Sequence, residues 1–156
     1  MSFRVSGLPV APFIRFFGLP DAELASHQIV RHTASQSPGF PCRVSLRDAE
    51  VGETLLLLNY EHLDVATPYR SSYAIYVREF AEEAQVAVDE IPEVLRRRLL
   101  SLRAFDESGM LLDADVIEGR NVEPLIERMF ANRKVEYIHV HNAKPGCFAA
   151  RVDRAG

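Results

Sequence analysis

Two histidines in the segment YIHVHN, residues 137–142, are the first side chains of this sequence that could do chemistry together. If the segment is a β-strand, His139 and His141 lie on one face of it, about 7 Å apart. Two imidazoles on one face can bind the same metal ion when the fold adds a further ligand. The alternative is that both histidines lie on the polar face of a sheet. The candidates for a further ligand are Cys42, Glu61, His62 and Asp64.

The two cysteines offer a second kind of chemistry. Cys42 and Cys147 each follow a Pro-Gly pair closely, and each has a basic residue nearby. A positive neighbour or a base lowers the pKa of a thiol from about 8.5 and makes it a nucleophile. A catalytic cysteine with His62, His139 or His141 as its base is therefore an enzyme hypothesis. Cysteines that only fill a core are the alternative.

Arginine and amide side chains suggest a third function, a pocket for a small anionic molecule. Guanidinium groups bind carboxylates and phosphates through paired hydrogen bonds, and a polar loop behind a buried strand commonly carries ligand contacts. Arginines that only form ion pairs at the surface are the alternative. In this hypothesis three cationic side chains hold the anion and three polar ones orient it: Arg43, Arg70 and Lys144 for the first role, Asn59, Tyr69 and Asn142 for the second.

The elements that must position these residues are mostly strands. The apolar run TLLLLNY, residues 54–60, predicts a central strand, and the aromatic and β-branched residues 73–80 predict another. Residues 100–117 form the clearest hairpin pattern, because Gly109 separates two apolar segments. The histidine segment, within residues 135–142, is a further strand, and CFAARVD closes the chain as its partner.

One helix is strongly indicated. In residues 121–131 the apolar side chains recur at helical spacing on one face, and Asn121 is a candidate N-cap. A second, shorter helix is expected after Pro92. Because strands outnumber helices and hairpins outnumber β-helix-β units, the sequence predicts an α+β fold. We expect a single globular domain, residues 1–156, with a mainly antiparallel sheet and two or three short helices.

Composition narrows the range of functions. The chain is 47% hydrophobic and 26% charged, which is the balance of a soluble globular protein. No segment approaches the roughly 18 to 20 apolar residues that span a membrane, and glycine and prolines interrupt any signal-peptide core near the N-terminus. A formal charge of −4 argues against nucleic-acid binding. We therefore expect a cytoplasmic protein, while its cofactor and oligomeric state stay open.

Three long segments carry a resemblance to a known family. PGFPCRVSLRDAEVGETLLLLNYEH, TPYRSSYAIYVRE and YIHVHNAKPGCFAARVDRA together resemble a bacterial family catalogued as domain of unknown function 1203. The resemblance extends over nearly the whole chain and implies a single bacterial cytosolic domain. It implies no activity, cofactor or site residue. Three hypotheses thus remain open. They are anion binding, an enzyme or metal site that uses the cysteines or histidines, and a protein-interaction module that uses a sheet edge or the helix at 122–130.

Overall fold

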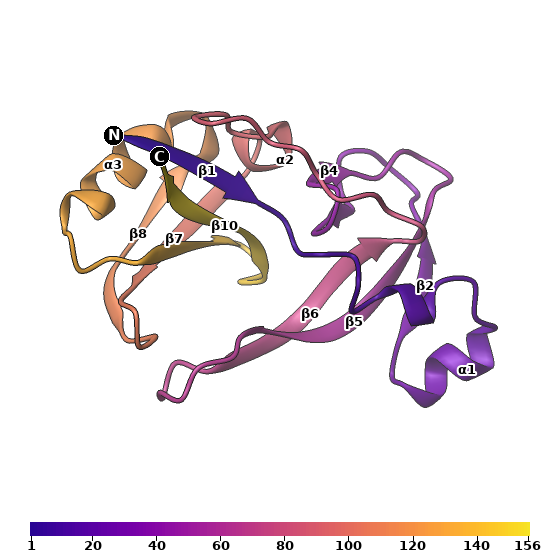
Figure 1. Ribbon diagram of the computed structural model, residues 1–156. Coiled ribbons are helices and arrows are strands. Elements are labelled where there is room, and N and C mark those ends of the chain that lie inside the picture. Colours follow the sequence, from indigo (N-terminus) through magenta and orange to yellow (C-terminus); the bar gives the residue numbers. More distant parts are fainter.

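Strands make up most of the regular structure in the computed structural model, which describes residues 1–156 (Figure 1). They form two main antiparallel sheets and one two-stranded ribbon, so the predicted α+β class is confirmed. The strands do not form one sheet, however. They divide into separate sheets, and a cavity lies between the two main ones. The helices are short: α1 (Asp21–Ser26), α2 (Glu93–Arg96) and α3 (Glu123–Ala131), with 3-10 turns η1 (Ile14–Phe16) and η2 (Gly119–Asn121).

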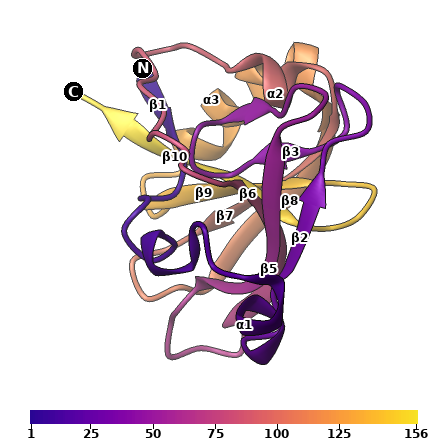
Figure 2. The same ribbon diagram turned by 90° about the vertical axis from the view of Figure 1, so that its right-hand side faces the viewer.

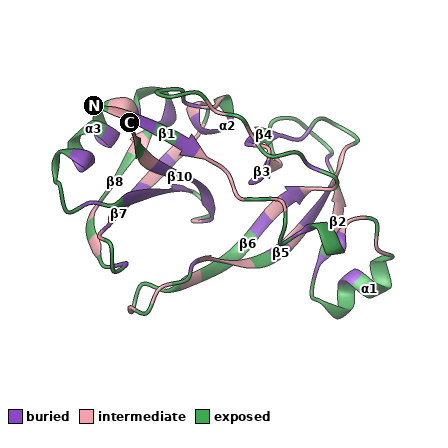
Figure 3. Cartoon of the chain, in the orientation of Figure 1, coloured by how far each residue is buried: buried purple, intermediate pink, exposed green.

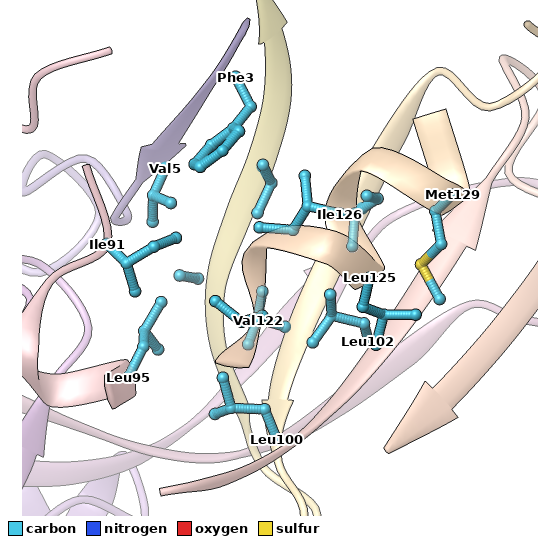
Figure 4. Close-up of a cluster of buried hydrophobic side chains, with 14 of the residues drawn as sticks. Phe3, Val5, Ile91, Leu95, Leu100, Leu102, Val122, Leu125, Ile126 and Met129 are labelled. Carbon is cyan, nitrogen blue, oxygen red and sulfur yellow. The ribbon is translucent and has the colours of Figure 1, made fainter. Parts of the chain in front are cut away.

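The larger sheet has five strands in the order β1-β10-β9-β7-β8, and each neighbouring pair is antiparallel. Helix α3 packs on one face of it, where the apolar face of the helix meets alternate residues of β7 such as Leu100 and Leu102 (Figure 4). This core contains 20 buried side chains and is the largest in the molecule. The strands are β1 (Ser2–Ser6), β7 (Leu99–Phe105), β8 (Leu111–Glu118), β9 (Tyr137–Asn142) and β10 (Phe148–Ala155).

The smaller sheet has three strands in the order β2-β5-β6, and it stands in front of the larger sheet in Figure 2. Its central strand contains the apolar run TLLLLNY, as predicted. A separate core of 11 buried residues covers one face of it. The strands are β2 (Val30–Thr33), β5 (Thr54–Leu63) and β6 (Ser71–Arg78), and the two-stranded ribbon consists of β3 (Pro41–Cys42) and β4 (Arg47–Asp48).

All six residues of β9 are buried, so both of its faces are covered, and the neighbouring strands β7 and β10 also contain buried stretches (Figure 3). Ile138 and Val140 point into the large core, as the strand period requires. The opposite face carries His139 and His141, which are only 3% and 2% exposed. It is covered in part by His62, at the end of β5, so the face of the strand that carries the histidines is buried against the second sheet. The sequence pattern separated the two faces but did not show that a second sheet covers the polar one.

Helix boundaries differ in detail from the predictions. Asn121 does not cap α3, because it belongs to η2 and no side chain caps the helix. Helix α2 ends at Arg96, and β7 begins at Leu99 after a tight turn. Arg97 and Arg98 therefore lie in that turn and not in the helix. No helix in the structure is long and apolar enough to cross a membrane.

Candidate functional site

A cavity of about 620 Å³ lies between the two main sheets, beside the turn that joins β9 to β10. Both sheets contribute to its wall, with Tyr73 from β6 and Glu118 from β8 among the lining residues. Four of the side chains that line it are cationic, and Glu118 is the one carboxylate. The wall is therefore positively charged, and its cationic residues are Arg43, Arg97, Arg98 and Lys144.

Arg43 is the most deeply buried of these cations, with an exposed fraction of 2%. Its Nε donates to the carbonyl oxygen of Phe148 at 2.7 Å, and its Nη1 donates to that of Pro41 at 2.7 Å. Its Nη2 donates to Sγ of Cys147 at 2.8 Å. No carboxylate lies within ion-pair distance of this guanidinium group. Burial lowers the pKa of Arg43, and the attraction of Cys147 opposes that shift.

The β9–β10 turn brings Asn142 and Cys147 to the same wall. The backbone N–H of Asn142 donates to the carbonyl of Cys147 at 2.9 Å, and Gly146 N–H donates back to Asn142 at 2.8 Å. Gly146 has a φ of +81°, which a residue without Cβ adopts readily, so the Pro-Gly pair shapes this turn. The side-chain nitrogen of Asn142, Nδ2, lies 3.7 Å from the Cys147 sulfur. The side-chain oxygen of Asn142, Oδ1, is buried without any hydrogen-bond partner.

A buried carboxylate holds the two arginines of the α2–β7 turn. The side chain of Asp48 is only 3% exposed and accepts hydrogen bonds from Arg98 at 2.5 and 3.0 Å and from Arg97 at 3.3 Å. Burial alone raises the pKa of Asp48, but the hydrogen bonds and charge of Arg98 outweigh it, and the pKa is lowered. Lys144, by contrast, is exposed and has no acidic partner.

The predicted histidines gather at a second, smaller cavity of about 250 Å³. His62 lies 6.1 Å from His139 and 5.1 Å from His141 between ring centroids. The ring of Phe148 stacks on His62 at 5.3 Å and meets His139 edge-on at 4.9 Å. Nδ1 of His141 is fixed by the carbonyl of Gly146 at 3.0 Å, whereas Nδ1 of His62 and of His139 has no partner.

These histidines are kept neutral by their surroundings. Burial lowers the pKa of His139 to about 3 and that of His141 to about 4, and the neighbouring cations add to both shifts. Burial lowers the pKa of His62 as well. No group of three or more His, Cys, Asp or Glu side chains is arranged to hold a metal ion. Metal ligation by His139 and His141 therefore stays a prediction from the sequence.

Four other predicted residues lie outside the cavity of Arg43. Arg70 is exposed and pairs with Glu61 at 2.6 Å. Asn59 is an exposed residue of β5 that lines neither cavity. Cys42 lies in the smaller core, where its sulfur accepts backbone N–H groups. No hydrogen bond joins either cysteine to a histidine, and Tyr69 lines the smaller cavity instead of the larger one.

Sequence reasoning missed several residues of the larger cavity. Arg97 and Arg98 belong to a run of three arginines that is typical of a solvated helix face. Neither lies in the helix, and both contact the buried Asp48, although Arg97 is exposed. Leu99 could have indicated their position. A strand that begins at this apolar residue requires the helix to end before it, which leaves Arg97 and Arg98 in the connecting turn. Tyr73 and Tyr76 gave no signal, since a strand pattern does not tell which tyrosine faces a cavity.

Comparison with known proteins gives a family but no function. Residues 39–154 match a family model that is described as "Protein of unknown function (DUF1203)". This range contains every residue that lines the two cavities. No curated protein and no solved structure matches the chain.

Proposed function

The chain belongs to the DUF1203 family, whose description assigns no function, and we propose that its larger cavity binds a small anionic molecule. The observation that carries this proposal is the charge of the wall, with four cationic side chains and one carboxylate around about 620 Å³. A volume of this size is typical of sites for small molecules. A carboxylate or phosphate group is the chemistry that suits such a wall.

Arg43 supports the proposal most directly. A buried charge is costly unless a counter-charge or hydrogen bonds compensate it. The guanidinium group has five N–H donors, and its three hydrogen bonds leave two of them free. A carboxylate or phosphate group in the cavity would accept hydrogen bonds from those two N–H groups and supply the missing negative charge.

The other cations have different roles in this proposal. Asp48 already balances much of the charge of Arg97 and Arg98, and it fixes their orientation. Lys144 has no partner on the protein and sits on the turn at the rim. We expect Lys144 to attract the ligand, and Tyr73 and Tyr76 to pack against its apolar part.

The proposal is tested by the two lysines of the chain, Lys134 and Lys144. Thermal unfolding is measured at constant ionic strength against a panel of small carboxylates and phosphate esters. Saturable stabilisation by at least one of them is expected, and Lys144→Ala should weaken its affinity about fivefold, since one rim charge is worth about 1 kcal/mol. Lys134→Ala removes the same charge from an exposed site outside the cavity and should leave the affinity unchanged. Equal affinities in both variants, or no saturable ligand, would overturn the proposal.

We also propose a bacterial, cytoplasmic location. It is supported by the two free cysteines, since a reducing compartment keeps thiols unpaired. The negative formal charge of −4 supports a small-molecule partner over nucleic acid.

A further inference from the structure

Cys147 lines the proposed anion cavity and contacts two hydrogen-bond donors there. We propose that Cys147 is a modification site of this cavity, where its sulfur is alkylated preferentially by small anionic electrophiles. This inference rests on the proposed anion binding and adds a covalent step at sulfur to it. It also assigns a role to the one thiol in the cavity wall.

The contact between sulfur and guanidinium is the first support. Nη2 of Arg43 donates to Sγ of Cys147 at 2.8 Å inside the protein, where both residues are more than nine-tenths buried. A thiolate at Cys147 would be the one negatively charged side chain in hydrogen-bond contact with Arg43. Charge-assisted hydrogen bonds of this kind favour the ionised sulfur, which is the form that attacks carbon.

Asn142 is an independent support, because it indicates a ligand. It is 5% exposed and lines the cavity, yet its Oδ1 has no hydrogen-bond partner. Buried polar atoms of proteins nearly always have a partner. The electrophile that best fits the cavity therefore has an N–H or O–H donor for Asn142 in addition to the anionic group for Arg43.

Cys42 provides a comparison within the same chain. It is also buried, but its sulfur lies in the smaller core and accepts backbone N–H groups of Ser45 and Arg78. It does not line the larger cavity. A reagent that reaches thiols through the cavity should therefore modify Cys147 and spare Cys42.

The covalent step is a simple displacement and needs no oxidant. With iodoacetate as the probe, the electron pair of the Cys147 sulfur forms a bond to the methylene carbon. The carbon–iodine bond breaks and iodide leaves with its electron pair, while the thiol proton passes to solvent. Iodoacetamide undergoes the same displacement without a negative charge. Its amide N–H is also a donor for Oδ1 of Asn142, so a preference for iodoacetate reports the negative charge alone.

The test compares the alkylation rates of iodoacetate and iodoacetamide in the folded protein, site by site, by peptide mass spectrometry. Free glutathione gives the intrinsic ratio of the two reagents. We expect the iodoacetate-to-iodoacetamide ratio at Cys147 to exceed that of glutathione about tenfold, as for anions that a cationic cleft concentrates. Lys144→Ala should lower the ratio, and Lys134→Ala should not. These surface variants avoid Arg43, whose replacement could prevent folding.

Two results would overturn the inference. One is a ratio at Cys147 equal to that of glutathione, and the other is modification of Cys147 only under conditions that also expose Cys42. The binding panel of carboxylates and phosphate esters, repeated on Cys147→Ser, separates this failure from that of the proposed function. If anions bind in a Lys144-dependent way but alkylation is not selective, only the modification site is contradicted. If neither anion binding nor selective alkylation is observed, the proposed anion cavity is contradicted as well.

Discussion

The environment of His139 makes the stability of the protein depend on pH. It is 3% exposed, and burial lowers its pKa to about 3. Repulsion between a protonated His139 and the groups that face it adds to this shift: His141 and His62 contribute when they are protonated, and Arg151 and Arg103 are always positive. The folded protein therefore keeps His139 neutral at a pH where the unfolded chain protonates it. Because the unfolded state then binds more protons, stability falls as the pH falls below about 6.5.

The variant His139→Gln isolates this contribution. A neutral amide cannot take up the proton in either state. Between pH 6 and 4, the free energy of unfolding should therefore fall less steeply in the variant than in the parent, by about 1.4 kcal/mol per pH unit. Urea titrations across that range measure the difference. His27→Gln serves as the control, because His27 is an exposed histidine far from β9 in the sequence. Parallel pH profiles for parent and His139→Gln would contradict the expectation.

The residue scale also shows how far the sequence could predict the site. Arg43, Asn142, Lys144 and Cys147 were all identified as candidates, and they line one cavity. They could be found because side-chain chemistry and turn residues are local properties. Their contacts could not be found, since the sulfur of Cys147 meets a guanidinium group 104 residues away instead of a histidine.

At the scale of elements, Asp48 fixes α2 and its turn to the β3–β4 ribbon. Its buried carboxylate is the acceptor for both Arg97 and Arg98. Asp48→Asn leaves the partly buried Arg98 without a counter-charge and leaves Arg97 with only the exposed Glu93, so it should destabilise the protein by about 2–3 kcal/mol. Chemical denaturation measures this loss. The matched control is Asp113→Asn, whose exposed pair with Arg128 should be worth less than about 1 kcal/mol. Similar losses in the two variants would refute a structural role for Asp48.

Gly119 marks a close approach between η2 and the end of α2. A Cβ at this position would lie 1.9 Å from the carbonyl oxygen of Leu95, which is backbone and has little room to move. Gly119→Ala should therefore cost about 3 kcal/mol in unfolding free energy, at the upper end for overpacking. Gly52→Ala is the comparison, because its φ of +93° is strained but its Cβ would meet open space. A smaller loss, about 1 kcal/mol, is expected there, and the reverse order would count against the steric argument.

Elements with strong periodic patterns were predicted well. The hairpin of β7 and β8 and the apolar face of α3 follow from alternation and helical spacing alone. The division of the strands into two sheets did not follow. It depends on pairings such as β1 with β10, which join the two ends of the chain and leave no local pattern.

At the scale of the whole molecule, the first strand completes the larger sheet although it lies outside the residues that match the family model. Phe3 is 3% exposed and belongs to the large core. Phe3→Ala should thus cost about 3–5 kcal/mol, measured by thermal or urea unfolding. Arg4→Ala removes a neighbouring exposed side chain and should cost less than about 0.5 kcal/mol. A negligible effect of Phe3→Ala would mean that β1 contributes little to the sheet.

The pairing of β1 with β10 also sets an order of events during synthesis. Ser2 lies opposite Ala155 in the register, so β1 cannot take its place in the sheet until β10 has been synthesised (Figure 1). The three strands of the smaller sheet all lie between Val30 and Arg78, and they can pair long before that. The nascent chain therefore lacks the sheet partner that buries Phe3 and Val5 until β10 has left the ribosome, and during this interval these apolar side chains are open to aggregation and to chaperones.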